Sequence, residues 1–478
     1  MIVVRDFRVA VVGGGIAGIA AALRLRDRAP AGTQITVFEQ SGALGGKLRT
    51  GELAGSRVEL GAEAFLVRDP TGGESAAVAL ARRVGLADAL VHPASVPAAL
   101  VIGGRLRAIP PGTLMGVPAD PEGLAEIARL QPERDRDGGR PLLRPDEDVA
   151  VGELVRSRLG DEVVDRLVDP MLGGVYAGRA DLLSLAATMP GLARTARVEH
   201  TLTGAVRAAL AAAPRPSGGP IFTTVAGGLD RLVTAAAQAS GARVRLNATV
   251  RELTRTADGW RLAVGPTRDP EVVTADAVVL AVPARPAARL LAGVDPAVAE
   301  HVGALDYASI ALITLALPAA RLPQLSGFLV PAVEGGLIKA ATFFTRKWPH
   351  LGRPDDVSLV RVSIGRHGEE QLLQRGDDEL VHTVRGELSA LLGPLPAPLA
   401  AHVQRWGGAL PQYAPGHPDR VAAARTALRS ACPTLALAGA GYDGVGIPVC
   451  IRSGERAAED VLAALAGLRE EMGSEARP

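Results

Sequence analysis

The sequence is poor in aromatic residues, cysteine and lysine. Of its 478 residues, 3% are aromatic and two are cysteine. An aromatic cage for a cationic ligand is hard to build from so few rings, and two cysteines exclude a disulfide framework. Lysine occurs only as Lys47, Lys339 and Lys347. Because the other cations are arginines, the presence of any single arginine says little about function.

The chain also lacks an excess of either charge and any long apolar run. It has 52 basic and 51 acidic side chains, which excludes the basic footprint of a nucleic-acid-binding protein. Apolar runs such as 310–317 and 435–440 are far shorter than the roughly 18 residues that a membrane span requires. No signal-peptide pattern precedes the first expected strand. We therefore expect a cytoplasmic protein without a transmembrane segment.

The most informative motif present is the segment VAVVGGGIAG at residues 9–18. Its apolar start, 9–12, predicts a buried strand, and residues 16–28 predict a helix. The glycines have the GxGxxG spacing, with Gly13, Gly15 and Gly18 at its three fixed positions. This spacing lets backbone amides at a helix N-terminus approach a pyrophosphate. The segment therefore predicts a dinucleotide site.

A carboxylate follows where such a site needs one. The expected strand 34–38 ends at Glu39, about twenty residues after the last glycine, where it can accept hydrogen bonds from an adenosine ribose. A second glycine turn, 45–46, is closed by Lys47. An ordinary NAD dehydrogenase does not need this turn, whereas a flavin lies extended along the sheet and needs a second close approach of backbone and a nearby cation. We favour FAD over NAD.

Later segments predict that the chain leaves this domain and returns to it twice. Residues 222–232 have the form of a strand, a glycine turn and the start of an amphipathic helix, and further strands are expected at 243–246, 249–254, 260–264, 277–282, 305–317, 327–331, 358–364 and 434–439. The predicted fold class is α/β. A discontinuous Rossmann-like FAD-binding domain (1–93, 214–295 and 405–478) is accompanied by a mainly helical inserted domain (94–213) and a mixed-sheet substrate domain (296–404). A polar stretch at 131–148 predicts an exposed loop, and 377–392 predicts a helix.

Eight segments, in order along nearly the whole chain, carry a family resemblance. They are GGGIAG at 13–18, Glu39, GGK at 45–47, LGAEAF at 60–65, DPMLGGVYAG at 169–178, TRKWPH at 345–350, LPQYAPGH at 410–417 and YDGVGIPVCIRSG at 442–454. Together they resemble the FAD-dependent coproporphyrinogen III and protoporphyrinogen IX oxidases. The first two segments are shared with amine oxidases and carotenoid desaturases, whereas GVYAG, KWPH, PQY and GVGIP are more particular. The chain departs from the pattern at Ala62 and Ala64, where family members often show proline and serine.

The resemblance implies a set of site residues. FAD contacts are expected at Gly13, Gly14, Gly15, Ile16, Ala17, Gly18, Glu39, Gln40, Gly46, Lys47, Gly61, Ala62, Glu63, Ala64, Val250, Val445, Gly446 and Ile447. Val250 and the 61–64 segment come from the resemblance alone. Substrate contacts are expected at Tyr176, Ala177 and Gly178, and we choose Arg68 as a partner for a propionate. Arg68 could equally be a solvated surface charge, and Tyr176 a core aromatic. No catalytic side chain and no metal are expected, because a flavin can accept hydride directly from the substrate.

The activity implied by the resemblance is a six-electron oxidation in haem synthesis, with dioxygen as the acceptor and hydrogen peroxide as the product. Coproporphyrinogen III is favoured because the arginine-rich composition is similar to that of the actinobacterial branch; protoporphyrinogen IX is the alternative. More remote alternatives are an amine oxidase, a polyene desaturase and a non-catalytic flavoprotein that binds porphyrin. Expected partners are haem-pathway enzymes, and the 94–213 region is compatible with peripheral contact at the inner face of a membrane.

Overall fold

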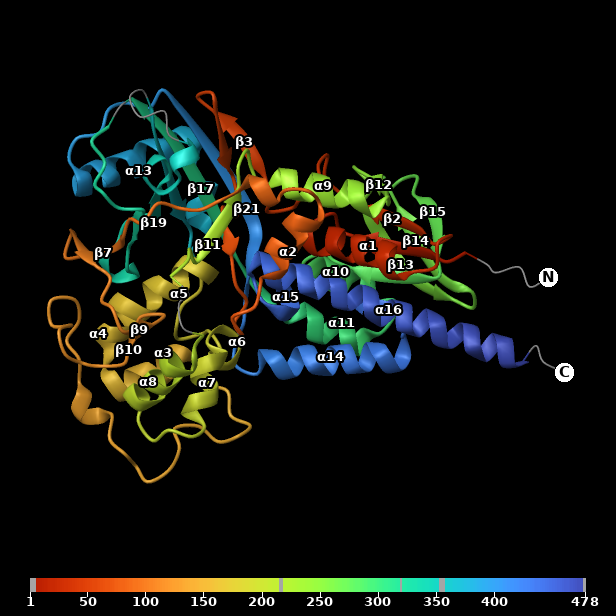
Figure 1. Ribbon diagram of the computed structural model, residues 1–478, viewed down its shortest axis with the longest axis horizontal. Coiled ribbons are helices and arrows are strands. Elements are labelled where there is room, and N and C mark those ends of the chain that lie inside the picture. Colours follow the sequence, from red (N-terminus) through yellow and green to blue (C-terminus); the bar gives the residue numbers. More distant parts are fainter. Residues whose placement is uncertain (1–5, 215–217, 319, 352–356, 476–478) are drawn as a thin grey trace.

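The chain folds into two lobes, one built on a parallel sheet and the other on a mixed sheet beside a group of helices (Figure 1). A computed structural model describes residues 6–214, 218–318, 320–351 and 357–475. In this part of the chain, no helix combines the length and the apolar character needed to cross a membrane.

The parallel sheet has five strands in the order β12-β2-β1-β16-β22. Their bounds are Arg243–Arg245, Gln34–Phe38, Arg8–Val12, Ala277–Leu280 and Leu435–Leu437, and every neighbouring pair is parallel. The predicted glycine turn joins β1 to α1 (Ile16–Arg28). Because β22 comes from near the C-terminus, distant parts of the chain complete one nucleotide-binding sheet, as the sequence predicts.

Alternate residues of β1 face two different cores. Val9 and Val11 pack toward α1, α9 (Asp230–Ser240), α16 (Ile447–Glu475) and α2 (Ala76–Arg83). Ala10 and Val12 pack toward the opposite layer. That layer holds the antiparallel strands β13 (Val250–Thr256), β14 (Gly259–Val264) and β15 (Glu271–Ala275), and helices α10 (Ala284–Leu291), α11 (Pro296–Gly303) and α14 (His417–Ala431). The near-continuous apolar strand of the sequence is thus buried on both faces.

The second lobe contains a seven-stranded sheet in the order β21-β17-β20-β19-β18-β7-β8. The strands are β21 (Ala400–Gln412), β17 (Asp306–Pro318), β20 (Val357–Ile364), β19 (Ile338–Phe343), β18 (Gly327–Leu329), β7 (Ala98–Ile102) and β8 (Arg105–Ala108). Helix α13 (Asp377–Leu392) packs on one face. β7 and β8 come from the segment expected to be mainly helical, and β21 extends into the segment expected in the FAD-binding domain; the division into domains itself stays a prediction.

The helical group packs beside this sheet in the lower part of Figure 1. It consists of α3 (Val151–Leu159), α4 (Asp161–Val163), α5 (Asp169–Tyr176), α6 (Leu185–Thr188), α7 (Pro190–Ala196) and α8 (Leu202–Ala212), with the short strands β9 (Thr113–Leu114) and β10 (Val117–Pro118). Its core includes Leu100 and Ile102 of β7. Sheet and helices therefore share apolar side chains.

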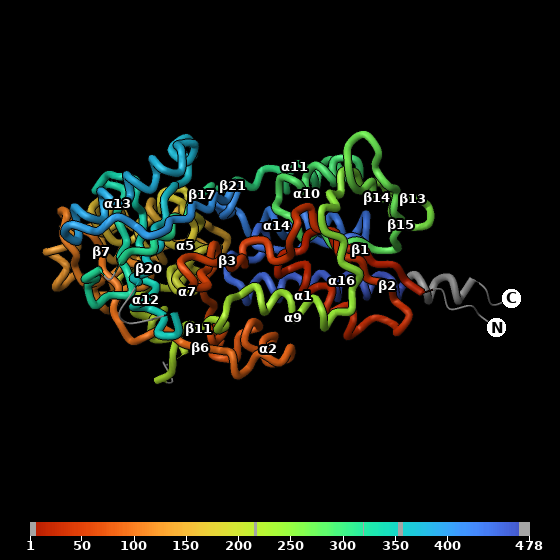
Figure 2. Tube along the Cα trace, turned by 90° about the horizontal axis from the view of Figure 1, so that it is seen from above, coloured from red at the N-terminus to blue at the C-terminus, as the bar shows by residue number. Residues whose placement is uncertain are grey.

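Small elements connect the two lobes. The hairpin β3 (Thr50–Leu53) and β4 (Ser56–Glu59) precedes a three-stranded sheet of β5 (Phe65–Leu66), β11 (Phe222–Val225) and β6 (Leu90–Val91). The remaining short helices are α12 (Phe344–Lys347) and α15 (Ala440–Asp443). In Figure 2, α1 and α16 lie side by side, and both pack against the core on one face of the parallel sheet.

Candidate active site

The centre of the site is a cradle of glycines at the carboxyl edge of the parallel sheet. Gly15 is the N-cap of α1, and the Gly45 amide donates a 2.8 Å hydrogen bond to the Gly14 carbonyl. A Cβ added at Gly15 would meet no atom within 4 Å, and one added at Gly46 would meet only the Gly15 Cα, at 3.6 Å. Two bare stretches of backbone thus face the same open space, and ligands of parallel α/β sheets bind at this edge.

Gly18 has a different role. A Cβ at this position would collide with the Gly13 carbonyl oxygen. Gly18 therefore allows α1 to pack against the turn that follows β1, whereas Gly15 leaves room for a ligand.

The Glu39 carboxylate is held in place beside this cradle. It is 9% exposed, and its two oxygens accept 2.8 Å hydrogen bonds from the Gly14 and Ser41 amides. Its backbone carbonyl accepts from the Ala248 amide at 2.8 Å, two residues before Val250. Each carboxylate oxygen keeps a lone pair for a further donor. The arrangement suits a ribose diol, and Val250 lies close to it along the chain.

Lys47 closes the cradle. Burial lowers the pKa of its ammonium group, and no carboxylate of the described residues forms an ion pair with it. Cys450 lies close enough to interact with it electrostatically, but burial raises the pKa of that thiol to about 11, so it is neutral. A partly buried cation without a protein counter-ion is consistent with a site for an anionic ligand.

The glycine-rich C-terminal segment closes the cradle from the other side. Val445, Gly446 and Ile447 lie where α16 begins, after β22, which β16 separates from β1 in the sheet. A Cβ at Gly454 would collide with the Ala17 carbonyl oxygen, so α16 and α1 touch backbone to backbone. The predicted FAD residues at the two ends of the sequence are therefore neighbours in space.

The segment 61–64 lies directly on the Lys47 turn. The Ala62 amide donates a 3.0 Å hydrogen bond to the Lys47 carbonyl, and a Cβ at Gly61 would collide with the same oxygen. Glu63 forms ion pairs with Lys347 and Arg361, and its side chain is 12% exposed. Burial raises the pKa of Glu63, but the two cations outweigh burial and bring it to about 2. The sequence missed Arg361 and the role of Lys347, although Lys347 stands in the TRKWPH motif.

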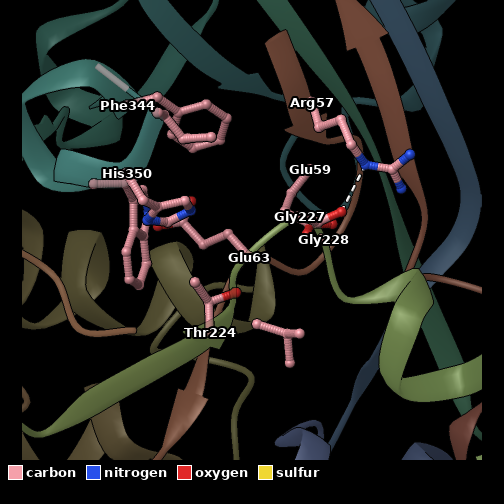
Figure 3. Close-up of a pocket in the computed structure, with 11 residues that line it drawn as sticks. Arg57, Glu59, Glu63, Thr224, Gly227, Gly228, Phe344 and His350 are labelled. Atoms are coloured by element: carbon pink, nitrogen blue, oxygen red, sulfur yellow. Dashed lines mark hydrogen bonds between the residues drawn. The ribbon is translucent and has the colours of Figure 1, made fainter. Parts of the chain in front are cut away.

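A pocket of about 330 Å³ opens beside Glu63 (Figure 3). Glu63 and Glu59 reach it from the β4–β5 region, and His350 and Phe344 line it from the other lobe. Burial lowers the pKa of His350, so this imidazole is neutral near pH 7. The pocket therefore lies where the two lobes meet, next to the predicted FAD segment.

Glu59, which lines this pocket, makes the folding stability of the protein depend on pH. It accepts a 2.7 Å hydrogen bond from the Leu229 amide, and burial raises its pKa to about 7, well above the ordinary 4.5. Between these values the native carboxyl holds a proton that the unfolded chain has lost, so stability falls as pH rises through about 7. We expect the melting temperature of the wild type, relative to Glu59→Gln, to fall by a few degrees between pH 5 and pH 8. Thermal unfolding of both proteins across this range tests the expectation, and parallel melting curves would contradict it.

The predicted substrate residues lie at the C-terminal end of α5. Ala177 has a positive φ of 51°, and a Cβ at Gly178 would collide with the Gln412 amide oxygen. The Tyr176 ring lies 5.7 Å from that of Tyr413, whose hydroxyl donates to the Ala440 carbonyl in the C-terminal glycine segment. Two tyrosines thus connect the α5 end to the cradle, and the role of Tyr413 was missed in the sequence.

Arg68 lies in an exposed loop. Its side chain donates a 2.9 Å hydrogen bond to the Gly72 carbonyl in the same loop. It does not line the pocket beside Glu63. Its predicted contact with a propionate has no supporting geometry.

Comparison with known proteins decides the family. The family model described as flavin-containing amine oxidoreductase matches residues 16–462. The chain belongs to the flavin-containing amine oxidoreductase family. The coproporphyrinogen III oxidase of Mycobacterium tuberculosis (strain H37Rv) is 39% identical over 95% of this chain and 97% of its own length, and that of Bacillus subtilis is 30% identical over 95% and 97%. A solved structure from Exiguobacterium sp. 255-15, named by inference as a protoporphyrinogen oxidase, superposes with a TM-score of 0.82 at 28% identity and covers 96% of this chain and 99% of that one.

This flavin-containing amine oxidoreductase is an FAD-dependent oxidase. The open space over Gly15, the amide-held Glu39 carboxylate and the unpaired Lys47 fit an FAD dinucleotide along the sheet edge. The individual FAD contacts named from the sequence stay predictions, but the structure gathers their backbone segments around one edge.

Proposed function

We propose that this chain oxidises coproporphyrinogen III to coproporphyrin III, with dioxygen as the acceptor. The observation that carries the proposal is the 39% identity to the M. tuberculosis enzyme of that name, over 95% of the chain. Six electrons and six protons leave the substrate, and three dioxygen molecules become three hydrogen peroxide molecules. When bound, FAD supplies the acceptor for hydride from a ring-bridging methylene.

The protein's own groups position the reactants. The Gly15 cradle and Lys47 hold the cofactor, and Gly173 and Gly178 line a pocket at the α5 end, close along the chain to Val175, which is 41% exposed. Apolar surface of this kind suits a flat tetrapyrrole. No side chain is needed as a nucleophile, so catalysis depends on orientation and on the exclusion of competing reactions.

The second candidate substrate is protoporphyrinogen IX. The human protoporphyrinogen oxidase is 28% identical to this chain over 95% of it and 98% of its own length. The two substrates differ in carboxylate number, four against two, so the choice depends on which cationic groups line the site. We favour the copro substrate on the higher identity of the relatives with that name.

The proposed location of the protein is the cytoplasm, and the proposed partners are haem-pathway enzymes. The helical group is the part that we propose for peripheral contact with a membrane surface. Both cysteines, Cys432 and Cys450, are free and buried. Free thiols of this kind are typical of a reducing compartment.

Turnover in air tests the proposed function. FAD-loaded protein and coproporphyrinogen III are expected to give rising coproporphyrin fluorescence and about three peroxide molecules per porphyrin, because each two-electron step reduces one dioxygen. Protein stripped of FAD is the control for autoxidation. A faster initial rate with protoporphyrinogen IX would favour the second candidate, binding without turnover would indicate a porphyrin carrier, and neither binding nor turnover would overturn the proposal.

A further inference from the structure

A second pocket, of about 240 Å³, lies between α5 and the mixed sheet. Its lining includes Asp169, Gly173 and Gly178 from the α5 region and Val330, Lys339 and Arg366 from the sheet. It is continuous along the chain with the predicted substrate residues, since Gly178 belongs to both. The pocket combines side-chain-free backbone with two cations.

Lys339 is buried without a counter-ion. It is 5% exposed, and its ammonium makes no hydrogen bond or ion pair with any residue that the structure describes. Burial and the nearby Arg366 lower its pKa to about 7. Burial of an isolated ammonium is unfavourable unless an anion joins it.

A β-bulge aims Lys339 at the pocket. On the facing strand β20, Ile338 pairs with Ile364 and Ala340 with Ser363, which leaves Lys339 as the extra residue of β19. Bulges of this kind redirect a side chain and are frequent next to active sites. The position of the ammonium is therefore set by the backbone rather than by a side-chain partner.

Arg366 is fixed next to it by backbone carbonyls. Its Nη2 donates to the carbonyl of Val330 at 3.1 Å and to that of Ile338 at 3.4 Å. Its nearest carboxylate oxygen belongs to Glu369, 3.9 Å from Nη1. The guanidinium is thus held mainly by neutral acceptors and keeps donors for a charged one.

The acid on the pocket lining does not balance these two cations. Asp169 accepts a 2.8 Å hydrogen bond from the Ala180 amide, and burial raises its pKa. Arg179, which is exposed, is a further cation near Asp169 and Arg366. Glu387 also acts on Arg366, but its carboxylate accepts from the Leu337 and Ile338 amides. The lining therefore carries surplus positive charge beside the apolar end of α5.

We propose that Lys339 and Arg366 form a carboxylate subsite that binds a propionate side chain of the tetrapyrrole while its ring lies on the α5 end. The inference rests on the proposed function, because it needs a flat substrate with carboxylate arms. An ammonium and a guanidinium at one spot suit a carboxylate, since both donate charge-assisted hydrogen bonds. Lys339 acts by positioning the substrate and takes no part in the oxidation.

Binding of a stable porphyrin to the FAD-loaded protein tests the subsite. The tetramethyl ester of coproporphyrin III keeps the ring and replaces each carboxylate with a neutral methyl ester, so we compare both ligands by fluorescence titration. Lys339→Met is expected to weaken the binding of coproporphyrin III about tenfold, which corresponds to about 1.4 kcal/mol. The affinity for the ester is expected to stay unchanged. Lys339→Arg is expected to stay within about threefold of the wild type because it keeps the charge. In turnover, Lys339→Met is expected to raise KM with little change in kcat.

Controls separate this role from a structural one. Arg268→Met removes a cation from an exposed turn and is expected to change neither titration. The melting temperature of Lys339→Met is expected to be unchanged or higher, since a thioether replaces an unpaired buried ammonium. If Lys339→Met weakens the binding of coproporphyrin III and of its ester equally, or does not weaken the binding of coproporphyrin III, the proposed subsite is overturned. A wild type that neither binds nor oxidises coproporphyrinogen III would remove the proposed function and the subsite together, whereas normal wild-type turnover with an unaffected variant removes the subsite alone.

Discussion

Gly15→Val is expected to give a folded, colourless protein. The position has φ −71° and ψ 173°, which valine adopts without strain. A Cβ there meets no protein atom within 4 Å, so the side chain enters only the space we assign to the pyrophosphate. We expect FAD affinity to fall at least about 100-fold, which corresponds to about 2.7 kcal/mol, and oxidase activity to disappear. Absorbance of the purified protein near the flavin bands and titration with FAD measure the effect.

The matched control is Gly376→Val. Gly376 is also a helix N-cap, with φ −63° and ψ 153°, and a Cβ there also meets nothing within 4 Å. It precedes α13, away from the parallel sheet. This variant is expected to stay yellow and active. A yellow Gly15→Val protein with ordinary FAD affinity would show that the cofactor does not pass over this turn.

Glu63→Gln is expected to cause a large loss of stability. It leaves the Lys347 ammonium and the Arg361 guanidinium in a partly buried place without their shared carboxylate. Removing one member of a buried ion pair costs about 3 kcal/mol or more, so the melting temperature should fall by several degrees. Because the 61–64 segment lies on the Lys47 turn, the variant should also release FAD more readily.

The pH dependence gives this prediction a second readout. The pKa of Glu63 is about 2 in the folded protein against an ordinary 4.5. The stabilising effect is therefore complete above about pH 4.5 and is lost as pH falls through 2. The difference in melting temperature between the two proteins should shrink below pH 4.5. The control is Glu126→Gln, which removes an ion pair between Arg107 and the 78% exposed side chain of Glu126. It should lower the stability by less than about 1 kcal/mol. Equal effects of the two variants would contradict our account of Glu63.

The local start of the fold could be predicted from sequence because it depends on short-range rules. The structure confirms β2 at 34–38 and α1 at 16–28 with the predicted bounds, and α13 at 377–392 likewise. In each case the apolar residues repeat with the period of a single type of element, helix or strand, and glycine or polar residues flank the segment. The FAD cofactor follows from the same segment.

Long-range pairing was harder to predict. β7 looked like part of a helical region, yet it lies parallel to β18 in the mixed sheet, and β19 was not expected at all. Nothing in a five- or six-residue apolar segment specifies a partner more than two hundred residues away. The two pockets therefore could not be predicted from the sequence.

Two of the three lysines, Lys339 and Lys347, were a signal that the sequence analysis did not use. In a chain whose cations are almost all arginine, Lys47 closes the FAD cradle, Lys347 pairs with Glu63 and Lys339 lies in the second pocket. Lysine supplies a compact ammonium on a flexible stem, whereas arginine supplies a planar guanidinium of the same charge. The rarity of lysine marks such sites only once the positions are known to be buried.

The backbone contact between Gly454 and Ala17 joins two segments that are synthesised far apart in time. β22 and α16, which complete the sheet and the glycine cradle, are among the last of the elements named above to be made. Until they are made, the nascent chain lacks one wall of the cradle, and the apolar face of α1 that α16 covers is exposed. We therefore expect a chain interrupted before α16 to bind FAD poorly and to be degraded faster than the wild type.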